Sequence, residues 1–155
     1  MNPTTIRALS LAVVVAVWAA ISEMAKVNLS LWPVIIALGC SLAAGGGIPG
    51  LQRTLAGTTS GVVWALVAHY VFRALGGRDL VQALVLGGVV LGIVLQARVP
   101  LLSYTAGALA GAGVALGMRA VSIQGGVRVA IALAVGAVLG FAAERLPQLV
   151  ASRRT

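Results

Sequence analysis

The chain has 155 residues, of which 60% are hydrophobic and 9% are charged, and its mean hydropathy is +1.06. Soluble domains carry charges on about a quarter of their residues. This composition therefore excludes an ordinary soluble domain and indicates an integral membrane protein. The net charge of +8 comes from basic residues dispersed singly at the ends of apolar stretches. That pattern suits anionic lipid headgroups and argues against nucleic acid, so we expect membrane lipid as a partner.

Six apolar stretches follow one another along the chain, at residues 6–22, 31–47, 55–75, 80–97, 101–121 and 127–143. Each approaches the roughly 17–25 residues that a helix needs to cross the hydrocarbon of a bilayer. Unpaired backbone amides are costly in lipid, and the period-2 alternation of barrel strands is absent. We therefore predict an all-α membrane protein with six transmembrane helices, in which residues 1–155 form a single transmembrane domain.

The first stretch also resembles a secretory signal, because Arg7 precedes an apolar run with Ala19 and Ala20. The run continues to Ile21 without a convincing cleavage site, which favours a membrane span. Six of the 11 basic residues fall on the side of the two termini. This small excess predicts that both termini lie in the cytoplasm.

The helices expected at 55–70 and 105–120 repeat one stripe of small residues at an offset of 50. The repeated positions are Gly57, Gly61 and Ala65 in the first helix and Gly107, Gly111 and Ala115 in the second. Stripes of this kind let helix backbones approach closely, and they favour a homo-oligomer as well as packing within the chain. The third and fifth helices of an alternating bundle run the same way. We therefore predict a parallel repeat of hairpins, second with third and fourth with fifth helix.

A run of three glycines, Gly45, Gly46 and Gly47, is followed by Pro49. Such a run would cost a helix several kcal/mol, so the second helix is expected to end or break here. One interpretation is a loop that dips into a water-filled vestibule and forms a constriction. An ordinary tight turn at the membrane interface is the alternative.

Small and mildly polar residues follow one face of the third helix, including Thr58, Gly61 and, near its end, His69. Either a pore lining or helix packing explains this face. Trp64 lies near mid-span, where it either narrows a pore or faces lipid. His69 is the only histidine, and an ionisable group within a span is a candidate gate, proton acceptor or solute ligand. Its place near the helix end allows a position at the headgroups instead.

The glycine-rich segment and the following Ser60-Gly61-Val62-Val63-Trp64 resemble a small bacterial inner-membrane family, domain of unknown function 1097. The resemblance covers nearly the whole chain and implies a bacterial inner-membrane location. Members of that family often carry asparagine before the serine, whereas this chain has Thr58 and Thr59. A side-chain amide role is therefore in doubt here, and the family brings no activity with it.

The acidic residues Glu23, Asp79 and Glu144 all lie at the ends of apolar stretches. A proton pump, a metal-dependent hydrolase or an intramembrane triad needs such groups within the membrane, and no phosphate-binding loop is present. We expect neither an enzyme, nor a metal site, nor a cofactor. Cys40 is the single cysteine, so no disulfide forms within the chain.

Two function classes remain. The first is a channel or facilitator for a small neutral or weakly charged solute, and the second is a structural or assembly protein whose glycine stripes serve packing. The candidate pore or solute-binding residues are Gly45, Gly46, Gly47, Pro49, Thr58, Gly61, Trp64, His69, Ser103, Gly107 and Gly111.

Overall fold

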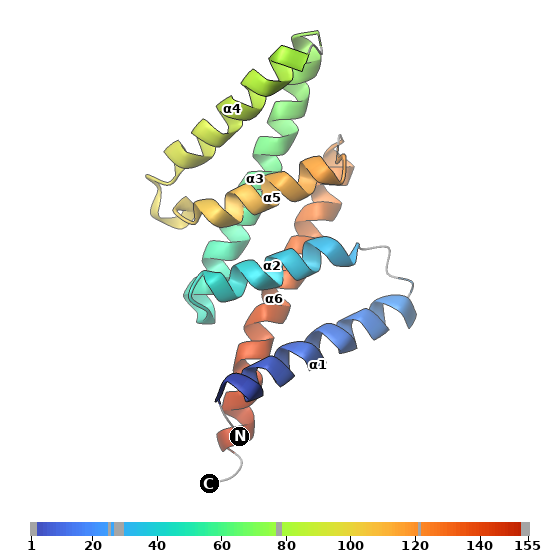
Figure 1. Ribbon diagram of the computed structural model, residues 1–155, viewed down its shortest axis with the longest axis vertical. Helices are drawn as coiled ribbons and strands as arrows, with labels where there is room; N and C mark the ends of the chain where they lie inside the picture. Colours follow the sequence, from blue (N-terminus) through green and yellow to red (C-terminus); the bar gives the residue numbers. More distant parts are fainter. Residues whose placement is uncertain (1–2, 25, 27–29, 77–78, 121, 153–155) are drawn as a thin grey trace.

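The computed structural model describes residues 3–24, 26, 30–76, 79–120 and 122–152. The described chain is helical, which confirms the all-α part of the predicted fold class (Figure 1). Its elements are α1 (Pro3–Met24), α2 (Leu31–Ala43), α3 (Gly47–Ala74), α4 (Asp79–Gln96), the short 3-10 helix η1 (Pro100–Leu102), α5 (Thr105–Gly117) and α6 (Ile123–Ser152).

Among the described residues, three helices are long and apolar enough to cross a membrane: α3, α4 and the part of α6 from Ile123 to Leu146. The α2 and α5 helices have 13 residues each. At 1.5 Å per residue each is about 20 Å long, less than the roughly 30 Å of bilayer hydrocarbon. The structure therefore supports a membrane protein, with three helices that meet the length expected of a span.

The second helix ends at the glycine run, as predicted, but the bounds of the joint were wrong. The apolar stretch reaches residue 47, whereas α2 ends at Ala43 because Gly45, Gly46 and Gly47 all have positive φ, at 96°, 65° and 63°. The α3 helix then starts at Gly47, so the expected joint at 48–54 is helical. Pro49 falls in the first turn, where the missing N–H is not needed for the helix.

The fifth apolar stretch, expected as one helix over 101–121, is divided. Pro100 opens η1, and α5 covers only Thr105–Gly117. The sixth helix is longer than the expected 127–143, because Gly125 and Gly126 already belong to its first turn. Apolar composition therefore located each helix but did not fix its length.

Two long helices, α3 and α6, run in opposite directions along the molecule, and the short α2 and α5 cross them (Figure 1). The most extensive contacts join α3 with α5 and α2 with α6, and α3 also packs on α6. Consecutive helices contact each other less.

Glycines make the two main helix contacts possible. A side chain at Gly61 would collide with the carbonyl of Ala108, and one at Gly111 would collide with the carbonyl of Thr58. In α6, a side chain at Gly136 would meet the backbone of Val34 in α2. Backbones of neighbouring helices thus touch directly, as small residues allow in membranes.

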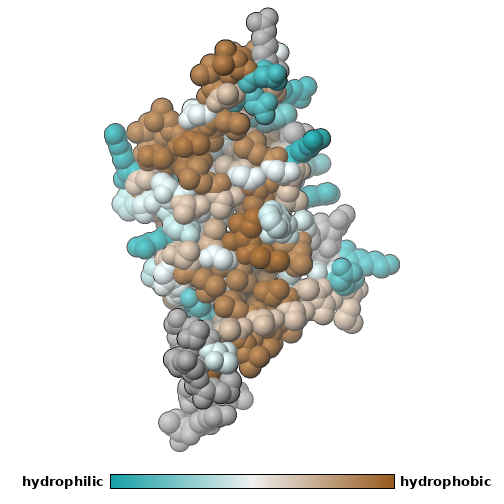
Figure 2. All heavy atoms as spheres, viewed as in Figure 1, coloured by the Kyte–Doolittle hydropathy of each residue, from teal (hydrophilic) through white to brown (hydrophobic). Residues whose placement is uncertain are grey.

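The distribution of hydrophobic and hydrophilic residues over the surface agrees with this arrangement of helices. Hydrophobic residues cover most of the face in Figure 2, and hydrophilic residues gather along its left and right edges. The ends of α2 and α5 lie at these edges in Figure 1. An apolar belt between two polar edges is the surface expected of a protein embedded in lipid.

Candidate functional site

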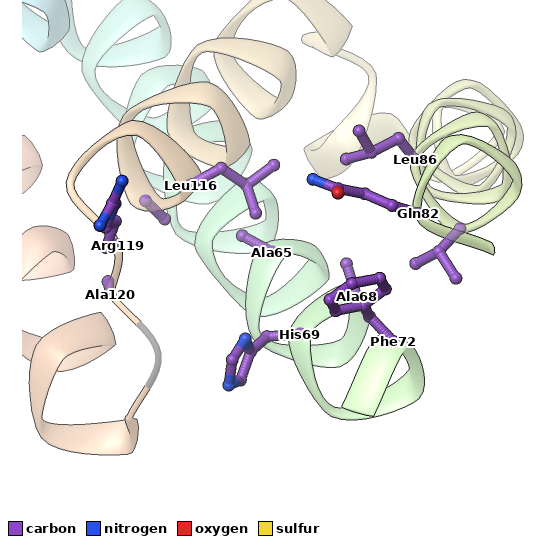
Figure 3. A pocket seen from close by; sticks show the side chains of 11 residues that line it. Ala65, Ala68, His69, Phe72, Gln82, Leu86, Leu116, Arg119 and Ala120 are labelled. Atoms are coloured by element: carbon purple, nitrogen blue, oxygen red, sulfur yellow. The ribbon is translucent and has the colours of Figure 1, made fainter. Parts of the chain in front are cut away.

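A cavity of about 350 Å³ lies where the second half of α3 meets α4 and the end of α5. Figure 3 shows His69 of α3 beside the segment that carries Arg119 and Ala120, while Gln82 and Leu86 reach in from α4. The lining residues are Ala65, Ala68, His69, Phe72, Gln82, Val85, Leu86, Ala115, Leu116, Arg119 and Ala120. The cavity is therefore mostly apolar, with three polar side chains at its rim.

The polar groups differ in what they offer a ligand. Arg119 supplies only hydrogen-bond donors and a fixed positive charge, and the amide of Gln82 both donates and accepts. His69 is half-buried and its ring meets that of Tyr70 edge-on, with centroids 6.0 Å apart. Arg119 and Gln82 are exposed. An acceptor-bearing solute small enough for the cavity would find donors at its rim.

Arg119 holds an unusual backbone position. It follows the end of α5 with φ 52°, and its N–H donates to the Leu116 carbonyl at 3.0 Å. Left-handed residues that close a helix in this way are usually glycine, because a Cβ costs about 1 kcal/mol there. Strain of this kind concentrates where a side chain has a function, so Arg119 is the first candidate at this site.

A polar chain links α3 to α4 beside the cavity. The Trp64 indole N–H donates to Gln96 Oε1 at 2.9 Å, and Gln96 Nε2 donates to Ser60 Oγ at 3.0 Å. The Trp64 ring lies against Gly92, where a Cβ would come within 2.6 Å of Cζ2. Trp64 therefore anchors α4 to α3.

The glycine run forms part of a second site at the other end of α3. The Gly47 N–H donates to Glu144 Oε2 at 2.8 Å, and a side chain at Gly46 would collide with the Glu144 carboxyl group. A cavity of about 230 Å³ lies here, lined by Leu11, Leu42, Ala143 and Glu144. The turn predicted from the glycines is thus held by a carboxylate from α6.

Two of the predicted site residues, Thr58 and Gly61, lie in the interface between α3 and α5. The Thr58 hydroxyl donates to the Thr54 carbonyl of its own helix at 2.7 Å. Gly111 faces them from α5, while Gly107 makes room for the Tyr104 ring, whose hydroxyl donates to the Cys40 carbonyl at 3.0 Å. These positions pack helix against helix.

Two predicted residues lie apart from both cavities. Pro49 is exposed in the first turn of α3. Ser103 is exposed after η1, and its hydroxyl donates to the Pro100 carbonyl at 2.8 Å.

Sequence reasoning did not select several residues that the fold brings to these sites. Arg119 was not among the candidate residues, and Glu144 was considered only as a charge at the end of an apolar stretch. Gln82 and Gln96 are the two amide side chains in the apolar stretch 80–97. Their position among apolar residues was the sequence signal that could have identified them. Thr54 and Ser41 are fully buried, and neither hydroxyl has a hydrogen-bond partner among the described residues.

Residues 8–148 match the model of a protein family described as "Protein of unknown function (DUF1097)". No curated protein matches the chain, and no solved structure does.

Proposed function

The chain belongs to the DUF1097 family, as its glycine-rich and Ser-Gly-x-x-Trp segments predicted, and because that family has no assigned activity we propose a function from the geometry. We propose a facilitator that moves a small neutral or weakly charged solute across the bacterial inner membrane. The observation that carries the proposal is the cavity at His69 and Arg119. About 350 Å³, with mostly apolar walls and a few polar groups, is typical of small-molecule sites.

The proposal includes six membrane crossings. Figure 1 supports this, since each helix ends nearer the polar edge of Figure 2 that lies opposite its start, with α3 and α6 steeply inclined along the molecule. The short α2 and α5 would need thinned bilayer or their flanking turns to complete a crossing. Both termini then lie on one side, which we propose is the cytoplasm from the excess of basic residues there.

The close packing in the middle of the bundle favours a facilitator that changes its conformation, rather than a permanently open channel. Between the two cavities, the backbones of α3 and α5 touch at Gly61 and Gly111. A solute entering at His69 could not pass along this interface without a movement of the two helices. The interior near Thr54 is partly polar, because the buried Thr54 hydroxyl has no hydrogen-bond partner among the described residues. We propose that a movement of the helices there would offer this hydroxyl to the solute as a hydrogen-bonding group.

The second candidate is a non-transporting structural or assembly protein. It is favoured by the use of Gly57, Gly61, Gly111 and Gly136 in helix contacts, because packing alone would explain these residues. The same contacts lie inside the chain, so the stripes are not free to join copies. A homo-oligomer stays a prediction, to be checked by mass measurement of the purified protein in lipid particles.

Flux into proteoliposomes tests the proposal. Leu116→Trp fills the cavity from α5, and Leu84→Trp adds the same ring on an exposed face of α4. We expect a small polar solute such as urea to enter faster than into protein-free liposomes, with flux lost in Leu116→Trp and retained in Leu84→Trp. If no solute in a panel of urea, glycine and glycerol enters faster than into protein-free liposomes, the structural alternative is favoured.

A further inference from the structure

The buried residues of α3 recur in α6 at an offset of 75 positions, as from Gly61 to Gly136. Seven of the eight buried residues of α3 recur: Thr54, Gly57, Thr58, Gly61, Val62, Ala65 and Ala68. Their buried counterparts in α6 are Val129, Ala132, Leu133, Gly136, Ala137, Gly140 and Ala143, while the counterpart of Gly50, Gly125, is half-buried. The two long helices therefore bury nearly the same face.

The short helices show the same correspondence at an offset of 74. Every buried residue of α2 has a buried counterpart in α5: Pro33, Val34, Ala37, Leu38 and Ser41 correspond to Gly107, Ala108, Gly111, Ala112 and Ala115. The closing turns agree as well. The Ala44 N–H donates to Cys40 and the Met118 N–H to Val114, both at 2.9 Å. The next residues, Gly45 and Arg119, both have positive φ.

Helical periodicity alone would align buried faces at several offsets, but it would not reproduce the contacts between helices. Gly61 of α3 lies against the carbonyl of Ala108 in α5, and its counterpart Gly136 of α6 lies against the carbonyl of Val34 in α2. Each long helix thus packs on the short helix of the other half. In Figure 1, a rotation of 180° about the line of sight places α3 on α6 and α2 on α5. In the molecule, each helix therefore runs in the opposite direction to its counterpart in the other half.

The two cavities also correspond. The four described residues that line the cavity at Glu144 each have a counterpart that lines the cavity at His69: Leu11, Leu42, Ala143 and Glu144 match Val85, Leu116, Ala68 and His69. The α3 helix runs from Gly47, which contacts Glu144, to His69 and beyond. At 1.5 Å per residue the cavities are about 33 Å apart along this helix, at its opposite ends.

We infer that helices α1–α3 and α4–α6 are inverted copies of one three-helix unit, and that the cavity at Glu144 is a second half-site for the transported solute, facing the other side of the membrane. This replaces the parallel hairpin repeat as the internal repeat of the chain. The half-site rests on the proposed function, whereas the inverted arrangement does not.

The different polar groups of the two half-sites specify the solute class. Arg119 offers only donors, so a solute held there needs an acceptor; the Glu144 carboxylate offers only acceptors, so a solute held there needs a donor. One Glu144 oxygen already accepts from Gly47. A small solute that binds to the two half-sites in turn therefore carries both a hydrogen-bond donor and a hydrogen-bond acceptor, as amides and zwitterionic amino acids do.

Labelling tests the inverted arrangement independently of transport. In a Cys40→Ala background, single cysteines replace the counterparts Leu42 and Leu116, and a third replaces the exposed Val99, which lies in the joint at the same edge as the end of α2 (Figure 1). A charged thiol reagent is applied to right-side-out and inverted vesicles. We expect Leu42→Cys to react from the same side as Val99→Cys, and Leu116→Cys from the opposite side. Reaction of both cavity cysteines from one side, or of neither, overturns the inverted arrangement.

Flux tests the solute class. Urea and glycine carry donors and acceptors, guanidinium carries only donors, and trimethylamine N-oxide only acceptors. We expect urea or glycine to enter proteoliposomes at least tenfold faster than guanidinium and trimethylamine N-oxide, each corrected for protein-free liposomes. Equal entry of urea and guanidinium overturns the solute class while the proposed function stands. Entry of none of the four refutes the proposed function and the half-site with it, and the labelling result still decides the inverted arrangement.

Discussion

Glu144 of α6 accepts a hydrogen bond from the Gly47 N–H at 2.8 Å, across 97 positions of the chain. The bond satisfies one of the free N–H groups at the start of α3, and a carboxylate is favourable at that end of a helix dipole. It also joins the start of one long helix to the end of the other. A contact between two segments far apart in the sequence thereby fixes the glycine turn.

Removing this carboxylate should destabilise the turn. Glu144→Ala leaves the Gly47 N–H without its partner, and we expect a loss of about 1–2 kcal/mol for this partly buried bond. Glu144→Gln keeps an acceptor oxygen and should lose less than half as much. Denaturant titration in detergent measures both. Equal losses in the two variants would show that the charge, and not the hydrogen bond, is what matters.

Gly111 and Gly113 provide a matched pair within α5. A side chain at Gly111 meets the α3 backbone, whereas one at Gly113 finds no described atom within 4 Å. We expect Gly111→Leu to abolish folding, because the overlap is with backbone, and Gly113→Leu to fold normally. Size-exclusion profiles and thermal stability distinguish the two. Normal folding of Gly111→Leu would refute direct backbone contact between α3 and α5.

We expect Arg119 to lower the stability of the fold and to increase solute flux. Arg119→Gly relieves the positive φ of 52° and should raise stability by about 1 kcal/mol. The same change removes the donor at the cavity, so we expect solute flux to fall by at least tenfold. Lys26→Gly is the control, since Lys26 has φ 48° and does not line the His69 cavity. That variant should gain stability without losing flux.

The unpartnered hydroxyl of Thr54 predicts a stabilising substitution. Thr54 is completely buried, and burying a hydroxyl without a partner costs about 1–3 kcal/mol. Thr54→Val keeps the shape and should raise stability, whereas Thr58→Val removes a satisfied bond and should not. Unfolding midpoints in one detergent give the comparison. A destabilised Thr54→Val would indicate a partner such as bound water.

The Trp64 and Gln96 bond should hold α4 in place. Trp64→Phe removes the N–H donor, which leaves the Gln96 oxygen unpaired, and it also removes the part of the indole that contacts Gly92. We expect a loss of more than about 2 kcal/mol from the two effects together, and faster proteolysis at the joint between α4 and η1. Gln82→Leu, on the exposed side of α4, serves as the comparison and should leave both quantities unchanged.

Sequence reasoning reached some parts of this structure and not others. Gly57, Gly61 and Gly111 were recognised as a packing stripe because close helix approach requires small residues, and the fold uses them so. Arg119 and Glu144 were passed over because neither has a local motif. Their importance depends on a left-handed turn in one case and on a partner 97 positions away in the other.

The inverted repeat that we infer has a different offset from the repeat predicted from the sequence. The α3 and α5 helices match in sequence at an offset of 50 because both need small residues where they meet. The inferred copies lie 74 or 75 positions apart, where a few pairs such as Gly61 and Gly136 are identical but others such as Thr58 and Leu133 share only burial. Burial is a property of the folded chain, so the few identical residues became meaningful only with the structure.

By itself the sequence determined that the protein is helical and belongs in a membrane, because hydrocarbon side chains and the cost of unpaired amides in lipid allow little else. It also determined where the second helix ends, since three glycines disfavour its continuation. Only the tertiary structure decided which helices are partners, because shape complementarity between α3 and α5 and between α2 and α6 depends on packing and not on order along the chain. That packing places His69 and Glu144 at opposite ends of α3, each beside a cavity.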